Sequence, residues 1–92
     1  MNPPFIVHWE KRADLDLARI YNAAADKNEI TRCENIANKA LSRHPDSIGK
    51  YHSEGLYTHD FGLLRFCYHI DFTHRAVYIL EIIQISWDEE NI

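Results

Sequence analysis

The sequence predicts an α+β fold in which two helices pack on one face of an antiparallel sheet. Two observations lead to this prediction. The C-terminal half holds two long stretches rich in β-branched and aromatic residues, and the N-terminal half holds two stretches with apolar residues at helical spacing. The element order is strand, helix, helix, then three or four strands. This order gives a two-layer sandwich written β-α-α-β-β-β(β).

The stretch around which the chain is organised is a hairpin, Leu63 to Trp87. Its first strand alternates apolar Leu64, Phe66, Tyr68 and Ile70 with polar or mixed residues, so one face is apolar. Its second strand, VYILEIIQI, is apolar on both faces apart from one Glu and one Gln. A strand of that kind is usually interior to its sheet.

The hairpin connection carries no Asn-Gly or Gly-X signal. We therefore expect a three-residue loop, Phe72-Thr73-His74, that closes an Asp71–Arg75 pair. That register sets Arg65 opposite Glu81 as a cross-strand ion pair. The same register sets apolar residues opposite one another, in the pairs Tyr68 with Tyr78, Phe66 with Leu80 and Leu64 with Ile82.

The N-terminal half begins with a short strand, Phe5 to Trp9, after two prolines. A first helix is expected from about Lys11 to Ala25, with an apolar stripe formed by Leu17, Ile20, Tyr21 and Ala24. Asp26 and Glu29 have the spacing of a capping box that starts a second helix. Pro45 ends that helix at His44. Its apolar side holds Ile30, Cys33, Ile36, Ala37, Ala40 and Leu41.

The segment between the helices and the hairpin is predicted to be a loop over His44–Gly49, followed by short strands. Lys50–Ser53 is a candidate edge strand, and Leu56–His59 is a strand that follows Gly55. Asp60-Phe61-Gly62 then forms the turn, with Gly62 at positive φ. We expect the last strand to be central, flanked by the N-terminal strand and the Leu63 strand.

The 92 residues are expected to form one domain with a single core. No signal peptide or apolar run of membrane-spanning length is visible, and Cys33 and Cys67 are interpreted as reduced core thiols of a cytoplasmic protein. The net charge of −4 comes entirely from residues 50–92, including a tail at Asp88–Glu90 that we expect to be solvated. Affinity for nucleic acid depends largely on cations that neutralise phosphates. This balance therefore argues against a phosphate-binding surface on the sheet half.

The candidate catalytic residues are Arg65, His59, His69 and Tyr57. If Asp60–Gly62 is a three-residue loop, His59 pairs with Leu63 and Tyr57 pairs with Arg65. All four then lie on the sheet face away from the helices. Such a group suits RNA cleavage, in which a base deprotonates the 2′-hydroxyl, an acid protonates the leaving oxygen and a cation stabilises the phosphorane. The simpler interpretation is that these residues are polar only because this face of the sheet is exposed to solvent. The histidine spacing matches no metal motif, and no cofactor site is expected.

The order of elements and several motifs resemble the RelE/ParE superfamily of toxins from bacterial type II toxin–antitoxin systems. The matching features are a first strand ending in Trp9, Ala13, the Asp16-Leu17…Ile20 helix, the Pro45–Gly49 loop, the Leu64–Asp71 strand and the closing Ala76–Ile85 strand. Within Leu64–Asp71, the residues Arg65, Tyr68 and Asp71 are similar to the family's strand pattern.

The resemblance implies a small cytoplasmic toxin that an antitoxin neutralises by wrapping around it. RelE-like members cleave mRNA in the ribosome and ParE-like members poison DNA gyrase. Where ribosome-dependent members carry Lys and Arg before the hairpin, this chain has Tyr57, Thr58 and His59. The resemblance therefore implies an mRNA interferase with altered catalytic residues. The alternatives are a non-catalytic protein-interaction module of the same fold, docking a partner at a sheet edge, and a ParE-like gyrase inhibitor.

Overall fold

A five-stranded sheet backed by two helices makes up the structure, a computed structural model that describes residues 3–85. The strands lie in the order β1-β5-β4-β3-β2; β1 and β5 are parallel, and all other neighbours are antiparallel. The elements are β1 (Ile6–Trp9), α1 (Lys11–Ala23), α2 (Lys27–Arg43), α3 (Pro45–Ile48), β2 (Lys50–Ser53), β3 (Leu56–Phe61), β4 (Leu64–Asp71) and β5 (Ala76–Gln84). The predicted fold class is confirmed, and so is the interior position of the last strand between β1 and β4.

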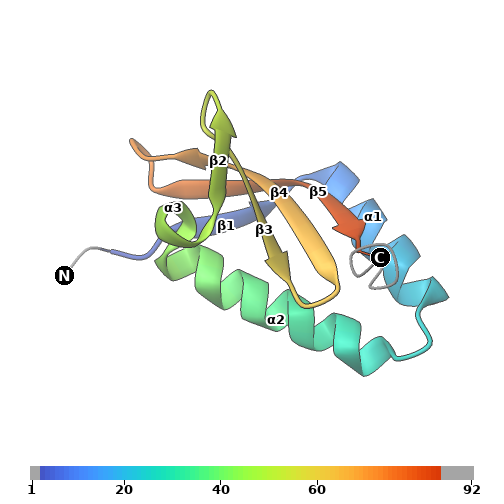
Figure 1. Cartoon of the computed structure of the whole chain (residues 1–92). Coiled ribbons are helices and arrows are strands. Elements are labelled where there is room, and N and C mark those ends of the chain that lie inside the picture. Colours follow the sequence, from blue (N-terminus) through green and yellow to red (C-terminus); the bar gives the residue numbers. More distant parts are fainter. Residues whose placement is uncertain (1–2, 86–92) are drawn as a thin grey trace.

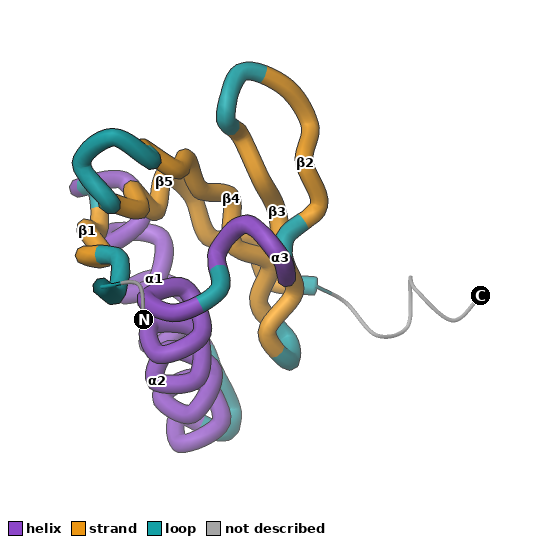
Figure 2. The backbone as a smooth tube through the Cα atoms, turned by 90° about the vertical axis from the view of Figure 1, so that its left-hand side faces the viewer, coloured by secondary structure: helices purple, strands orange, loops and turns teal. Residues whose placement is uncertain are grey.

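The helices α1 and α2 cover one face of the sheet, and the β2–β3 hairpin extends beyond them (Figures 1 and 2). The predicted cap is present, because the Asp26 carboxylate accepts a hydrogen bond from the Glu29 amide at 3.2 Å. Two residues assigned to the apolar sides are exposed: Tyr21 is 40% exposed and Ile36 58%. The predicted loop at His44–Gly49 contains the short helix α3, in which Pro45 is the first residue.

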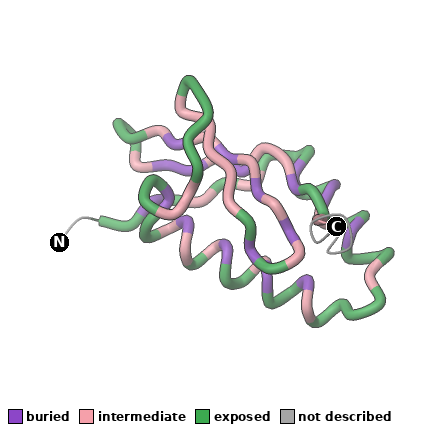
Figure 3. The backbone as a smooth tube through the Cα atoms, viewed as in Figure 1, coloured by how far each residue is buried: buried purple, intermediate pink, exposed green. Residues whose placement is uncertain are grey.

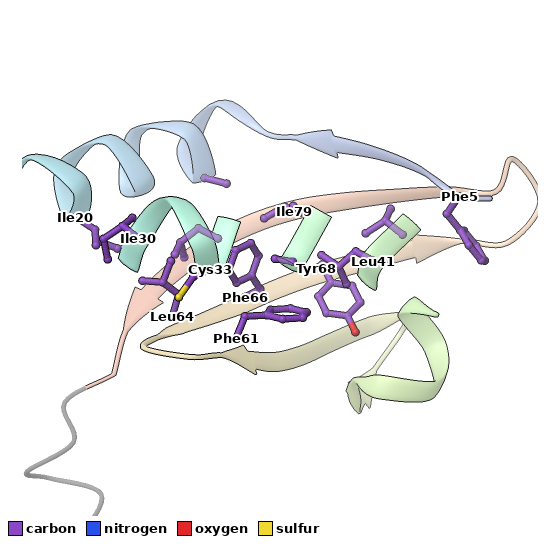
Figure 4. Packing of buried hydrophobic residues seen from close by; sticks show 14 of the residues in the cluster. Phe5, Ile20, Ile30, Cys33, Leu41, Phe61, Leu64, Phe66, Tyr68 and Ile79 are labelled. Carbon is purple, nitrogen blue, oxygen red and sulfur yellow. The ribbon is translucent and has the colours of Figure 1, made fainter. Parts of the chain in front are cut away.

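The core lies between the helices and the inner face of β4 and β5 (Figures 3 and 4). The alternation read in the first hairpin strand is confirmed, since Leu64, Phe66, Tyr68 and Ile70 are all buried. Their helical partners are Ala13 and Ile20 from α1 and Ile30, Cys33, Ala37 and Leu41 from α2. Cys33 and Cys67 are both free thiols; Cys33 is buried in the core, whereas Cys67 is half-buried on β4.

The predicted β4–β5 register is wrong. The connection has four residues, and Arg75 takes the left-handed conformation at φ 48°. Asp71 holds this turn, because its carboxylate accepts the His74 amide at 3.1 Å and lies 2.8 Å from His74 Nδ1. A bulge between Cys67 and Tyr68 shifts the pairing further.

As a result, the predicted cross-strand partners are replaced throughout the hairpin. Arg65 lies opposite Ile83 instead of Glu81, and Glu81 bonds Arg12 of α1 at 2.9 Å. Three further observed pairs differ from the prediction in the same way, namely Tyr68 with Ile79, Phe66 with Ile82 and Leu64 with Gln84.

The β3–β4 connection also differs from the prediction. It is a two-residue turn at Gly62 and Leu63, so Asp60 and Phe61 belong to β3 and Phe61 pairs with Leu64. Gly62 does adopt positive φ, at 61°. A Cβ at this glycine would lie 2.8 Å from the Cys33 sulfur, so the turn also needs the missing side chain for space.

The outer edge of β5 is covered in part by β1 and in part by a side chain of α1. β1 pairs with it up to Ile79, and beyond that point the Asp16 side chain of α1 accepts a hydrogen bond from the Ile82 amide at 3.1 Å. Asp16 is 5% exposed and is also paired with Arg19. The Asp16 side chain thus occupies one backbone donor of β5 that β1 does not pair. Trp87 and the acidic tail lie outside residues 3–85, and no helix in the described part is long and apolar enough to cross a membrane.

Candidate functional site

The four predicted site residues do not share one face of the sheet. Tyr57 pairs with Tyr68 and His59 pairs with Phe66, whereas the sequence placed Tyr57 opposite Arg65. Paired residues on neighbouring strands point to the same side of a sheet. Because Tyr68 and Phe66 are buried against the helices, Tyr57 and His59 lie on the helix-covered side.

Arg65 and His69 alternate with those buried residues and lie on the helix-free face. They are separated by four residues along β4, about 13 Å at the usual rise of a strand. The prediction that all four residues meet on the helix-free face is therefore wrong. The three-residue loop at Asp60–Gly62, on which it depended, does not form.

Tyr57 and His69 each pack against other rings. The Tyr57 ring stacks on Tyr68 at a centroid distance of 5.7 Å and meets Tyr51 edge-on at 5.3 Å. The His69 ring lies 6.5 Å from that of Tyr78, which in turn stacks on His8 at 5.0 Å. Both side chains thus have packing partners that account for their positions.

Arg65 and His59 lie on opposite faces of the sheet, but both line a hollow of about 540 Å³ where β3 extends past the end of β2. The hollow is lined by Ile48, Lys50, His52, Thr58, His59, Asp60 and Arg65. Four of these residues carry cationic or titratable nitrogen groups. The His59 ring rests edge-on against Phe61 at 4.6 Å, which fixes one side of the hollow to the core.

The guanidinium of Arg65 is engaged by Asp60, its partner across the sheet. Its Nε and one terminal nitrogen donate to the two carboxylate oxygens at 2.8 and 3.1 Å. The hydrogen bonds and charge of Arg65 hold the pKa of Asp60 below its ordinary value, so the carboxylate is ionised at neutral pH. Asp60 therefore offsets the positive charge that Arg65 brings to the hollow.

Two residues on β2 that the sequence reasoning did not select also line the hollow. Lys50 lies opposite Thr58, and the His52 ring nitrogen Nε2 is 2.8 Å from the Thr58 hydroxyl oxygen. The turn that brings them there contains Glu54 at φ 49° and Gly55 at φ 80°. The sequence held the signal, because a hairpin through Gly55 folds the expected Lys50–Ser53 strand back onto Leu56–His59.

A hollow with imidazoles, a lysine and a fixed ion pair suits acid–base chemistry on an anionic substrate. Among residues 3–85, no group of three or more His, Cys, Asp or Glu side chains is arranged to hold a metal ion. The imidazole and ammonium groups of the hollow can transfer protons and bind anions through their own side chains.

Comparison with known proteins places this geometry in a known fold. No protein-family model matches the chain, and no curated protein matches it. Solved structures do match. A chain of the toxin–antitoxin complex RelBE2 from Mycobacterium tuberculosis is 25% identical, with a TM-score of 0.76, over 91% of this chain and 94% of that chain. The chain has the fold of the RelE/ParE toxins.

Two further structures with the RelE/ParE fold support this assignment at lower identity. The archaeal RelE–RelB complex from Pyrococcus horikoshii matches at 16% identity and a TM-score of 0.67, over 90% of this chain and 97% of that chain. A chain of the ParDE system from P. aeruginosa gives the same identity and TM-score over 89% and 97%. The fold implied by the sequence resemblance is thus confirmed over most of the chain.

Proposed function

We propose that this chain is the toxin of a type II toxin–antitoxin module and that a small antitoxin protein binds and neutralises it in the cytoplasm. The observation behind this proposal is the similarity to RelBE2 across 91% of the chain, together with the fold of the RelE/ParE toxins. Two of the similar structures are complexes of a toxin with its antitoxin. A protein partner of that kind is therefore the first to seek.

The proposed activity is cleavage of RNA at the hollow between β2, β3 and β4. The reaction requires a base for the 2′-hydroxyl, an acid for the leaving 5′-oxygen and positive charge beside the phosphate. His59 is assigned to proton transfer because its ring lines the hollow and is held by Phe61. His52 is the second candidate for proton transfer, held by the Thr58 hydroxyl. An imidazole suits both roles near neutral pH.

Arg65 is assigned a structural role in the wall of the hollow, because its ion pair with Asp60 fixes the positions of both side chains. Tyr57 and His69 are not used in this scheme, because each packs against aromatic rings away from the hollow. Of the four residues predicted from the sequence, the scheme therefore keeps only His59 and Arg65.

A second candidate function is a non-catalytic interaction module that kept the RelE/ParE fold. The observation that favours it is the Arg65–Asp60 pair, since a neutralised arginine is a poor cation for phosphate chemistry. A ParE-like action on DNA gyrase is the third outcome that an assay must separate.

Transcript integrity after induction of the chain in bacteria tests the RNA-cleavage proposal. Wild type is expected to produce transcripts cut at defined positions, and His59→Ala is expected to reduce cutting by about 10²-fold or more. His8→Ala is the matched control, because His8 lies on β1 outside the hollow. Intact transcripts with DNA damage would replace the RNase assignment by gyrase inhibition. Intact transcripts and DNA, with a bound protein partner, would favour the non-catalytic module.

A further inference from the structure

A second hollow, of about 660 Å³, lies where segments distant in the sequence meet at one end of the molecule (Figure 1). The segment before β1, the junction of α2 with α3 and the β4–β5 connection all line it. It shares no lining residue with the hollow between β2, β3 and β4, so its role does not depend on the RNA-cleavage proposal. Its volume is within the range of small-molecule sites.

Arg75 is anchored in the wall of this second hollow. Its Nε and one terminal nitrogen both donate to the Pro3 carbonyl, at 2.9 and 2.6 Å, and its guanidinium lies 4.1 Å from the centre of the Phe5 ring. The Phe5 ring is buried, and the Phe5 amide donates to the Ser42 carbonyl of α2 at 2.7 Å. A guanidinium carries more N–H groups than these two bonds use. Arg75 is therefore held in place by the core and keeps donors for a ligand.

Two more basic residues, Arg43 and His44, line the same hollow at the C-terminal end of α2. Both are exposed, and within residues 3–85 their side chains make no hydrogen bond or ion pair. Among the described residues that line the hollow, Asp46 of α3 is the one carboxylate. Two guanidinium groups against one carboxylate make this hollow positive, although the whole chain has a net charge of −4. Guanidinium groups of this kind bind phosphate oxygens in pairs.

An exposed aromatic ring lines the hollow together with these cations. Phe72 is 53% exposed in the β4–β5 connection, and its ring meets the Phe5 ring edge-on at a centroid distance of 6.2 Å. The backbone amides of Phe5, His44 and Arg75 already donate to carbonyls within the chain. An extended peptide, which binds through backbone hydrogen bonds, therefore finds no free amide donor at these three residues. Recognition by side chains favours a small ligand that combines a flat ring with phosphate groups.

We propose that this hollow binds a purine nucleoside diphosphate, with the base against Phe72 and the phosphates on Arg43 and Arg75. The purine supplies a flat ring for the phenyl group, and the diphosphate supplies oxygens for both guanidinium groups. The two arginines come from different parts of the chain, the end of α2 and the β4–β5 connection, so the bound diphosphate bridges them. The binding is electrostatic in part and therefore weakens as the salt concentration rises.

The test is isothermal titration calorimetry of the purified full-length chain with ADP and with GDP, at low salt and without divalent metal. Saturable binding is expected at ligand concentrations below about 1 mM. Arg43→Gln should weaken binding by about tenfold, and Arg43→Lys should recover only part of the loss, because an ammonium group lacks the fork that binds two oxygens. Phe72→Leu keeps an apolar side chain but removes the ring, and it should weaken binding by about tenfold as well.

Lys11→Gln is the matched control, because it removes one positive charge from an exposed position on α1 outside the hollow. It should change the affinity by less than about twofold, since distant surface charges are screened. Inorganic pyrophosphate has the phosphates without the base and should bind at least about tenfold more weakly than ADP. Circular dichroism establishes that each variant is folded.

Any of the following results would overturn the inference. The wild type shows no saturable binding of either nucleotide. Folded Arg43→Gln or Phe72→Leu keeps the wild-type affinity. Lys11→Gln loses as much affinity as Arg43→Gln, or pyrophosphate binds as tightly as ADP.

Discussion

The contact between Gly49 and Tyr68 predicts that substitutions at these positions are energetically coupled. Tyr68 is fully buried, and its hydroxyl donates to the Pro45 carbonyl of α3 at 2.7 Å (Figure 4). Burial raises the pKa of Tyr68 above its ordinary value, so the hydroxyl remains a donor in mildly alkaline solution. This bond ties α3, and the start of β2 that follows it, to the core.

The single substitutions are each expected to destabilise the fold. Tyr68→Phe leaves the Pro45 carbonyl without this donor and should lower the free energy of unfolding by about 1–2 kcal/mol. Gly49 has φ −85°, which any residue adopts, so the backbone tolerates alanine there. The added Cβ, however, would lie 2.0 Å from the Tyr68 hydroxyl oxygen. Gly49→Ala should therefore cost about 1–3 kcal/mol through overpacking.

The double variant removes the obstructing oxygen, and the nearest remaining atoms lie at 3.0 and 3.2 Å from the new Cβ. Its loss of unfolding free energy should be smaller than the sum of the single losses by at least about 1 kcal/mol. Urea unfolding of the four proteins, followed by tryptophan fluorescence and circular dichroism, measures this coupling. Losses that add within about 0.5 kcal/mol would refute the proposed contact.

Three further predictions follow from other contacts. Asp16→Ala should lower the free energy of unfolding by about 2–3 kcal/mol, because it leaves the buried Ile82 amide without its charged acceptor; a loss under about 0.5 kcal/mol in urea unfolding would contradict this. The pKa of Asp60 is depressed in the folded state by Arg65, so its stabilising effect is present above the unfolded-state pKa of about 3.9 and is lost as the pH falls through the folded value. Asp60→Asn should remove the contribution of Asp60 to the loss of stability at low pH. If the variant and the wild type gave the same plot of urea midpoint against pH, this contribution would be contradicted. Burial raises the pKa of Cys67, so iodoacetamide should modify this thiol slowly at neutral pH and faster in alkaline buffer; mass spectrometry that finds rapid neutral modification would exclude the assignment.

The fold was predictable because local and global signals agree along most of the chain. The alternation from Leu64 to Asp71 predicted the buried face of β4, and the apolar character of β5 predicted its interior position. The Asp26 cap set the start of α2 correctly. Each of these three predictions depends on residue spacing or composition within a single helix or strand, and both can be read directly from the sequence.

The strand registers could not be read in the same way. Alternating strands of this type satisfy several pairings, and the choice depends on turn length. In the β4–β5 connection, contacts between the Asp71 carboxylate and His74 stabilise a four-residue turn. In the β3–β4 connection, the positive φ of Gly62 permits a two-residue turn. The bulge between Cys67 and Tyr68 leaves Leu80 of β5 without a paired residue, and the sequence does not distinguish Leu80 from its apolar neighbours.

The errors in register explain the errors at the candidate site. A shift of three residues between β3 and β4 moved Tyr57 and His59 to the opposite face and put Asp60 beside Arg65. Lys50 and His52 were missed for a different reason. They line the hollow because the β2–β3 hairpin folds β2 back against β3.

The central claim is that the chain is a toxin neutralised by a protein partner, and growth of a bacterial culture after tightly controlled induction tests it most directly. We predict arrest when the chain is expressed alone and recovery when the adjacent reading frame, expected to encode a small antitoxin, is co-expressed. Purified toxin and antitoxin should then elute together. Unaffected growth with soluble, folded protein in the cells would contradict the claim and leave the fold without toxic activity.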